Sequence, residues 1–289
     1  MAFSRDMAGI DVRLIAIDID GTLLDSRGRV SDDNVAAVLA ALEAGVHVVL
    51  ITGRSYPFAR AVVQGVLPET VSLIVSNGAI ERTLGGHTLA SRLLARDAAR
   101  RILEQTRAFR HHSAILFDRE TEGHVVAESL DWDHPHRRRY WERHRHFIGH
   151  AAPLEAALTE DPIQVMFNGD VETMRAVFAS LDGLQEVFVC RTEYERSDFS
   201  LVDVLAPTAT KGRALAWRAA ELGIEPARIM AIGDNFNDLE MLELAGVPVV
   251  MGNAVEGLRN RGWSETATHD QSGVAQAIQR LVLNPRARG

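Results

Sequence analysis

The sequence predicts an α/β fold, in which a doubly wound parallel sheet carries an inserted α+β unit. Two observations lead to this fold class. Apolar runs typical of buried strands alternate with helical patterns towards both ends of the chain, at 14–17, 46–51, 72–75 and 228–232. Between about 83 and 206, strand-like runs instead outnumber helical ones. The first pattern predicts a parallel sheet covered by helices, and the second a mixed or antiparallel sheet.

The elements of the parallel sheet can be assigned in order along the chain. Ser31 is the predicted N-cap of a helix with an acidic first turn, and Gly45 closes that helix. Its apolar positions recur at helical spacing: Val35, Val38, Leu39 and Leu42. Strands at 46–51 and 72–75 follow, so we expect parallel pairing through right-handed crossovers.

The middle of the chain is predicted to form a unit of its own. Its expected helices are 96–107 and 171–181, and its expected strands are 115–117, 125–126, 163–167, 187–189 and 201–204. From Pro207 the alternation of helix and strand returns. We therefore expect a core formed by residues 1–82 and 207–289, and a cap formed by residues 83–206. The expected hinges are 84–86 and 206–208, which contain glycine or proline.

Carboxylates follow the first predicted strand directly. Asp18-Ile19-Asp20-Gly21 comes at the end of the run 14–17, and the glycine allows a sharp turn. Open α/β sheets place their chemistry beyond the carboxyl ends of the strands, where two such carboxylates can converge on one cation. A surface turn is the alternative interpretation, because Asp and Gly are also turn residues.

Three further segments deliver polar groups to the same edge of the predicted sheet. They are Thr52-Gly53-Arg54, the single Lys211, and Gly233-Asp234-Asn235-Phe236-Asn237-Asp238. The carboxylates of Asp18, Asp20, Asp234 and Asp238 cannot all be ionised in one cleft without a counter-charge, because like charges raise each other's pKa. A divalent cation resolves this conflict, and an all-oxygen site suits Mg²⁺.

In this order, the four segments resemble the haloacid dehalogenase (HAD) superfamily of phosphotransferases. Ser76-Asn77-Gly78-Ala79 and Met251-Gly252-Asn253-Ala254 are similar to segments of its Cof-type group, which has an inserted type IIB cap. The resemblance extends from about Arg13 to about Leu283. It implies a Rossmann-like core, a cap that sets specificity by closing over it, and hydrolysis of phosphomonoesters.

The resemblance also implies a role for each carboxylate. Asp18 is expected to be the nucleophile that forms an aspartyl-phosphate, and Asp20 the general acid and base. Asp18 and Asp234 are expected to bind Mg²⁺ through their carboxylates, and Asp20 through its backbone carbonyl. Asp238 is expected to orient a metal-bound water or Lys211 without touching the metal itself.

Phosphate and substrate contacts are implied in the same way. Thr52 and Lys211 are expected to hold the phosphoryl oxygens, with Lys211 also offsetting the charge between nucleophile and phosphate. The further candidates for contact with phosphate or substrate are Gly53, Arg54, Asn77 and Asn237. Arg54 can equally well pair with an acid and be structural. The region of His269 and Asp270 departs from the family, which often has an Asn there.

The predicted activity is Mg²⁺-dependent hydrolysis of a small phosphorylated metabolite, such as a sugar phosphate. A phosphomutase is an alternative, since the same aspartyl-phosphate can transfer to a second hydroxyl. A non-catalytic sugar-phosphate-binding protein is another, although no core motif position has been lost. Release of phosphate from p-nitrophenyl phosphate separates a hydrolase from a binding protein.

Composition narrows the classes of partner. A net charge of −8 argues against nonspecific binding to nucleic acid, which requires a basic face. The single cysteine, Cys190, excludes an internal disulfide and is consistent with a reducing cytoplasm. The first thirteen residues lack the apolar centre of a signal peptide, and no stretch approaches the length of a membrane span. We expect a cytoplasmic monomer or weak homodimer.

The predicted cap contains a run rich in His and Arg between His134 and His150. The run is either an anion-attracting surface, a transition-metal site or a solvated face. No acid or cysteine with metal-ligand spacing supports the metal interpretation.

Overall fold

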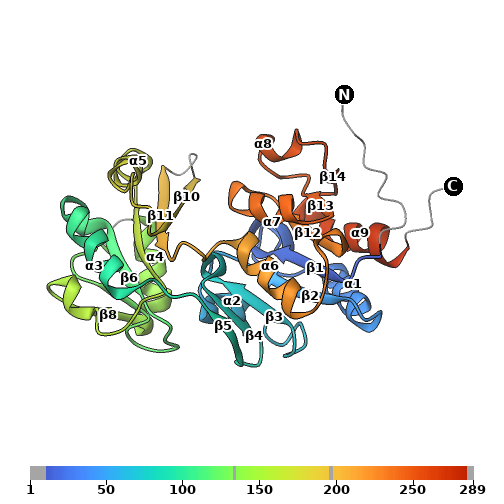
Figure 1. Ribbon diagram of the computed structural model, residues 1–289, viewed down its shortest axis with the longest axis horizontal. Coiled ribbons are helices and arrows are strands. Elements are labelled where there is room, and N and C mark those ends of the chain that lie inside the picture. Colours follow the sequence, from blue (N-terminus) through green and yellow to red (C-terminus); the bar gives the residue numbers. More distant parts are fainter. Residues whose placement is uncertain (1–10, 133–134, 195–197, 285–289) are drawn as a thin grey trace. The chain divides into compact units, whose positions relative to one another are not determined.

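The computed structural model describes residues 11–132, 135–194 and 198–284 of the chain. The chain folds into two compact units, and Figure 1 shows that each is built around its own sheet. One unit, the core, contains the residues up to Ser91 and those from Thr210 onward. The other unit, the cap, contains residues 92–209.

The core sheet has eight strands in the order β14-β13-β12-β1-β2-β3-β4-β5. Their bounds are β1 Leu14–Asp18, β2 His47–Ile51, β3 Ser72–Val75, β4 Ile80–Thr83, β5 Thr88–Ser91, β12 Ile229–Gly233, β13 Val247–Val250 and β14 Ser264–Glu265. All pairs from β14 to β3 are parallel, and only the β3–β4 and β4–β5 pairs are antiparallel. This confirms the predicted doubly wound parallel sheet.

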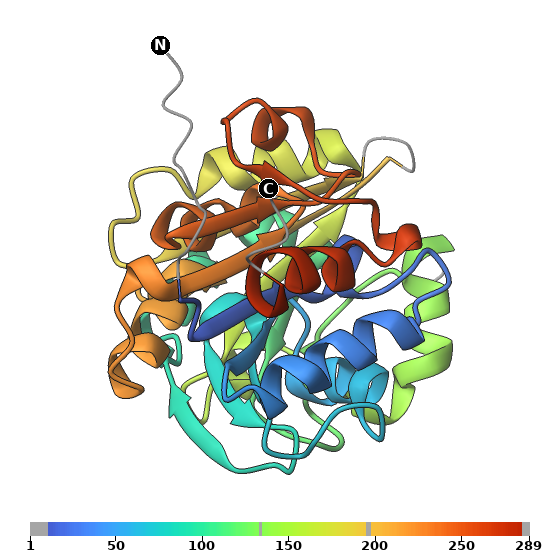
Figure 2. The ribbon, with the colours of Figure 1, turned by 90° about the vertical axis from the view of Figure 1, so that its right-hand side faces the viewer.

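Strand β1 lies at the centre of this sheet, between β2 and β12, and all five of its residues are buried. The core helices are α1 Asp32–Glu43, α2 Tyr56–Val63, α6 Lys211–Glu221, α7 Leu239–Leu244, α8 Glu256–Arg259 and α9 Gly273–Ile278. Helix α1 packs against α9, as Figure 2 shows, and α6 packs against α7. Ser31 caps α1 by accepting a hydrogen bond from the Asn34 amide at 3.3 Å, as its sequence pattern predicts. The parallel strands therefore end together at one edge, where the polar segments follow.

The cap sheet has six strands in the order β10-β11-β9-β6-β7-β8. Their bounds are β6 Ser113–Leu116, β7 Val125–Ala127, β8 Ile148–His150, β9 Gln164–Gly169, β10 Phe188–Tyr194 and β11 Phe199–Leu205. All pairs are antiparallel except β7–β8. Helices α3 (Arg96–Gln105) and α5 (Val171–Ser180) pack on one face of the sheet, over an apolar layer that includes Val165, Phe167, Val202 and Val204. The mixed sheet confirms the predicted α+β character of this unit.

The limits of the two units differ from those expected from sequence. The chain leaves the core after Ser91, not near 83, and returns to it at Thr210, not at 207. The reason is the hairpin β4–β5, which extends the core sheet by antiparallel pairing with β3. The predicted hinge at 84–86 is the turn of that hairpin, in which Gly86 has a φ of +97°.

The run rich in His and Arg forms α4 (Pro135–His144), the short turn Arg145–Phe147 and strand β8, while His134 lies outside the described residues. Arg137 is buried and donates hydrogen bonds to the side chain and backbone of Asn168, and to the Asp131 carbonyl at 3.3 Å. Burial also lowers the pKa of Arg137. Arg137 therefore anchors α4 inside the cap and is not part of a solvated or anion-attracting face.

Candidate active site

The ammonium group of Lys211 lies between two buried carboxylates. Its Nζ donates to Asp18 Oδ1 and to Asp238 Oδ1, both at 2.6 Å. Asp18 is the last residue of β1, and Lys211 is the first residue of α6, whose N-cap Thr210 accepts from the Arg213 amide at 3.1 Å. All three members of this triad are at most 4% exposed. The core thus brings the end of the first strand and a residue far along the chain into direct contact.

Asp238 is held on one side by the loop after β12 and on the other side by Lys211. Asp238 Oδ2 accepts from the backbone amides of Asp234 and Asn235, at 3.0 and 3.1 Å, while its Oδ1 accepts from Lys211. Gly233, the last residue of β12, allows this close approach, because a Cβ there would lie 2.7 Å from Asp238 Cβ. Asp238 therefore ties the loop to Lys211, which agrees with an orienting role.

Three carboxylates are close enough to bind one cation. Ligand oxygens of Asp18, Asp234 and Asp238 all lie within 4.8 Å of one another, and Thr22 Oγ1 donates to Asp234 Oδ1 at 3.4 Å. Such a set of hard oxygen donors fits Mg²⁺ better than a softer metal.

Burial and mutual repulsion dominate the electrostatics of this site. Burial, with the charge of Asp238, raises the pKa of Asp18 well above its usual value, although Lys211 opposes the rise. The same two causes raise the pKa of Asp234 to about 7. Burial lowers the pKa of Lys211, but the charges of Asp18 and Asp238 outweigh it, so its pKa is raised. The site therefore has an excess of negative charge, which a divalent cation would neutralise.

The carboxylate of Asp20 does not belong to this cluster, contrary to the expectation that all four acids converge. Arg54 holds it through two hydrogen bonds, from Nε at 2.8 Å and from Nη2 at 2.6 Å. The Asp20 side chain is 53% exposed, whereas the clustered Asp18 is buried. The cause is the turn Ile19–Leu23, in which Asp20 and Gly21 leave helical geometry and redirect the side chain. Of the two interpretations of Arg54, the structure shows the ion pair with an acid.

Thr52, Gly53 and Asn77 lie side by side beyond β2 and β3. The backbone amide of Asn77 donates to the backbone carbonyl of Thr52 at 3.0 Å, and a Cβ on Gly53 would lie 3.1 Å from the side-chain Oδ1 of Asn77. Asn77 has a φ of +53°, and its buried Oδ1 accepts no hydrogen bond from any described residue. Asn237 lies in the turn Phe236–Asp238 after β12.

Sequence reasoning missed the contribution of Asn253. Its Nδ2 donates to the Gly21 carbonyl at 2.8 Å, and its Oδ1 accepts from the His269 amide at 2.9 Å. Asp270, which follows His269 in the chain, accepts a hydrogen bond from the backbone amide of Ser26 at 2.8 Å. The segment around His269 and Asp270 therefore supports the loop that follows β1. The only signal in the sequence was the family-like Met251-Gly252-Asn253-Ala254 segment.

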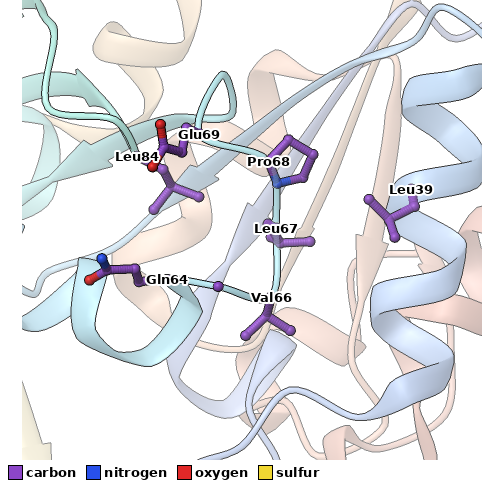
Figure 3. Close-up of a pocket in the computed structure, with 8 residues that line it drawn as sticks. Leu39, Gln64, Val66, Leu67, Pro68, Glu69 and Leu84 are labelled. Atoms are coloured by element: carbon purple, nitrogen blue, oxygen red, sulfur yellow. The ribbon is translucent and has the colours of Figure 1, made fainter.

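A separate pocket of about 420 Å³ is lined by Leu39, residues 64–69 and Leu84 (Figure 3). Residues 64–69 lie between α2 and β3, so the pocket is at the amino end of β3. Catalysis in such sheets occurs at the opposite edge. None of the predicted site residues lines this pocket, and the carboxylate cluster remains the candidate site.

Comparison with known proteins agrees with this geometry. Residues 15–278 match the family model of haloacid dehalogenase-like hydrolases. The putative phosphatase YxeH of Bacillus subtilis is 31% identical, over 94% of this chain and 98% of the relative. The 5-amino-6-(5-phospho-D-ribitylamino)uracil phosphatase YwtE of the same organism is 27% identical, over 94% and 98%. The solved structure of a sugar phosphatase of HAD subclass IIB has a TM-score of 0.73 and 21% identity, over 93% of this chain and 98% of the other.

The family match covers most of the chain and includes every segment that forms the carboxylate cluster. Named relatives that align along nearly their whole length are phosphatases. In the described part of the chain, no helix is long and apolar enough to cross a membrane. The chain therefore belongs to the haloacid dehalogenase-like hydrolases of the Cof type, and it is a phosphatase.

Proposed function

We propose that the protein is a Mg²⁺-dependent phosphomonoester hydrolase that works through an aspartyl-phosphate. The observation that carries this proposal is the position of Lys211, whose ammonium contacts both Asp18 and Asp238 at 2.6 Å. A buried cation beside a buried carboxylate suits the attack of that carboxylate on a phosphate dianion, because it offsets the repulsion between the two.

In the first step, a carboxylate oxygen of Asp18 forms a bond to phosphorus as the bond to the ester oxygen breaks. Asp20 gives a proton to the departing alkoxide. In the second step, Asp20 takes a proton from water, whose oxygen attacks phosphorus and releases inorganic phosphate and the Asp18 carboxylate. Arg54, which donates to both oxygens of Asp20, would orient this carboxylate for both proton transfers.

The carboxylates of Asp18 and Asp234 would hold Mg²⁺, with Asp20 contributing its backbone carbonyl. When bound, the metal supplies positive charge that neutralises the phosphoryl oxygens. Thr52 and Lys211 would hold the phosphoryl group, and Gly53 and Asn77, which lie beside Thr52, would assist them. Asn237 is assigned a weaker contact. Asp238 keeps Lys211 in position.

We infer that the substrate is a small phosphorylated metabolite, and specifically the phosphate of a sugar or sugar alcohol. Two proteins to which the chain is similar support this class. One is named for a substrate with a phosphorylated ribityl chain, and the other is named a sugar phosphatase. The cap, 92–209, would carry the residues that select among such substrates.

The test is hydrolysis of p-nitrophenyl phosphate by purified protein in the presence and absence of Mg²⁺. We expect turnover that EDTA abolishes and Mg²⁺ restores. Calcium should not restore it, because its longer bonds and larger coordination number do not suit the compact site. Full activity after exhaustive chelation would contradict the metal requirement, and no turnover with any phosphomonoester would contradict the proposed function.

A further inference from the structure

Three consecutive residues after β3 adopt left-handed backbone angles. The φ values are +49° at Ser76, +53° at Asn77 and +110° at Gly78. Only glycine reaches this region without strain, so Ser76 and Asn77 are held there against their own preference. Both residues are buried, with 1% and 4% of their surface exposed. Strain of this kind persists only where the surrounding structure determines it, and it is concentrated at functional sites.

The side chains of this turn do not account for its shape. Asn in a left-handed conformation is commonly stabilised by a local hydrogen bond from its own side chain. Here Ser76 Oγ and Asn77 Oδ1 are both buried, and neither atom forms a hydrogen bond with any described residue. The cause of the left-handed geometry therefore lies in what the backbone of the turn contacts.

The first of these contacts is the segment that contains Thr52. The backbone amide of Asn77 donates to the Thr52 carbonyl at 3.0 Å, and that of Ser76 donates to the Arg54 carbonyl at 2.8 Å. The Thr52 amide donates to the carbonyl of Ile74 in β3 at 2.9 Å. Successive amides of an extended strand point to opposite sides, so two neighbouring amides reach one segment only where the chain turns. Both backbone groups of Thr52 are thus fixed by β3 and this turn.

The second contact is with the residue before Lys211. A Cβ on Gly78 would lie 2.4 Å from the Thr210 carbonyl oxygen and 2.7 Å from its carbonyl carbon, which is bonded to the Lys211 nitrogen. Thr210 is the N-cap of α6, and its carbonyl accepts from the Ala214 amide at 2.9 Å. Any side chain at position 78 would therefore displace the first turn of α6, and Lys211 with it.

The turn thus contacts both segments that are expected to hold the phosphoryl group, and all of these residues belong to the core. We propose that Ser76–Gly78 is a positioning element that fixes Thr52 relative to Lys211, with Gly78 as the positioning residue that permits the close approach to Thr210. The turn acts through its backbone. This inference rests on the proposed phosphatase function and deepens it, because it names the element that brings the two phosphate-holding groups to one site.

The test compares Gly78→Ala with the matched control Gly86→Ala. Gly86 has a φ of +97°, and a Cβ there would meet only Tyr56 Oη, at 3.8 Å. Both variants place alanine at a positive φ, but only Gly78→Ala displaces Thr210. With p-nitrophenyl phosphate, Gly78→Ala should lower kcat by about 10²-fold. It should raise the Ki of inorganic phosphate about tenfold, which is the order of effect of one misplaced hydrogen bond to a charged group. Gly86→Ala should keep both constants near wild type.

Metal binding separates positioning from a general loss of structure. The carboxylates of Asp18 and Asp234 are the predicted ligands of Mg²⁺, and they follow β1 and β12, not β3. Gly78→Ala should therefore keep most of the rise in melting temperature that Mg²⁺ causes, while inhibition by phosphate is weakened. Equal loss of both responses would show that Gly78 only supports the fold, and would overturn the inference.

Two variants of Ser76 decide the matter if Gly78→Ala does not fold. Ser76→Thr keeps the hydroxyl group, but its branched Cβ resists a positive φ. Ser76→Ala loses the hydroxyl group and adopts the angle more readily. Positioning by the backbone predicts that Ser76→Thr raises the Ki of inorganic phosphate and that Ser76→Ala does not. The reverse pattern would show that the Ser76 hydroxyl itself binds phosphate, and this result or equal values for the two variants would overturn the inference.

The same variants separate this inference from the proposed function. If wild type hydrolyses p-nitrophenyl phosphate and Gly78→Ala matches Gly86→Ala in both constants, the inference fails and the phosphatase function stands. If wild type hydrolyses nothing, the proposed function fails, and calorimetric titration with inorganic phosphate and Mg²⁺ replaces the kinetic assay. Binding that Gly78→Ala weakens and Gly86→Ala keeps then supports the positioning turn, and absence of binding by wild type overturns it.

Discussion

Arg54 donates to both carboxylate oxygens of Asp20, at 2.8 and 2.6 Å. The planar fork of a guanidinium fits a carboxylate in this two-bond geometry, which a lysine ammonium cannot reproduce. Thr52 in turn holds the backbone of Arg54, because the Arg54 backbone amide donates to Thr52 Oγ1 at 3.1 Å. Thr52, which is expected to hold phosphate, and Asp20, the expected general acid, are therefore linked through one residue, Arg54.

The first prediction follows from this link. Arg54→Ala should lower kcat by about tenfold for an alkyl phosphate, because Asp20 loses the contact that orients it, and less for p-nitrophenyl phosphate, which needs little protonation. Arg54→Lys should fall between Ala and wild type. The melting temperature should change little, since the pair is partly exposed and such pairs contribute about 0–1 kcal/mol. An equal loss of kcat on both substrates would show that Arg54 acts elsewhere.

Replacing Asp18 or Asp20 by asparagine, which has the same shape, distinguishes the roles of these two carboxylates. Asp18→Asn should abolish turnover, because an amide cannot attack phosphorus, while the fold persists with Lys211 still held by Asp238. Asp20→Asn should slow turnover of alkyl phosphates by about 10²–10⁴ and that of p-nitrophenyl phosphate less. Steady-state kinetics and circular dichroism provide the measurements. Near-native phosphatase activity of Asp18→Asn would show that the nucleophile is a different group.

The prediction for Lys211 concerns stability as well as activity. Lys211→Met leaves Asp18 and Asp238 buried without their shared cation, and breaking a buried pair in this way costs about 3–5 kcal/mol. The loss should be larger at pH 8 than at pH 5, because protonation of the buried acid Asp18 relieves it. Urea unfolding at both pH values measures the difference. Adding Asp238→Asn to Lys211→Met should restore part of the stability but no activity, whereas additive losses would contradict the coupling.

Much of this site could be predicted because it follows from topology. Parallel strands end at one edge, so polar residues after β1 and β12 had to meet there. The direction of the Asp20 side chain depended on the dihedral angles of one turn, which no spacing reveals. Whether β4 and β5 belong to the core depended on the pairing of β4 with β3, which is a tertiary contact. The burial of Arg137 depended on its partner Asn168, which is distant in sequence. The catalytic roles of the residues stay predictions.

Metal binding should depend on pH in a direction set by Asp234. Its pKa is raised from 3.8 to about 7 in the folded protein, so the folded state binds more protons than the unfolded state between these values. The metal-free protein should therefore lose stability as pH rises from about 4 to 7. Mg²⁺ requires the deprotonated carboxylate, so the increase in melting temperature that it causes should be larger at pH 8 than at pH 5.5.

Asp234→Asn is the control for this dependence. It should reduce the pH slope of the metal-free protein and remove most of the shift caused by Mg²⁺. A remaining slope is expected from Asp203, whose pKa is also raised to about 7. A shift with Mg²⁺ that is equal at both pH values in wild type would exclude these carboxylates as the metal ligands.

The final prediction uses two glycines with similar backbone angles. Gly21 has a φ of +81°, and a Cβ there would lie 2.4 Å from Asp234 Oδ2. Gly28 has a φ of +74°, but a Cβ there would meet nothing within 4 Å. Both alanine variants carry the strain of a positive φ, about 1 kcal/mol, so only Gly21→Ala adds a clash with the carboxylate cluster.

Gly28→Ala should lower the melting temperature slightly and keep kcat close to wild type. Gly21→Ala should lower kcat by about 10²-fold, because a displacement of about 1 Å at the reacting groups has that effect. It should also weaken the Mg²⁺-induced rise in melting temperature, because the displaced carboxylate is a predicted ligand. If both variants lose activity equally, backbone strain in the segment after β1, and not the contact between Gly21 and Asp234, controls the site.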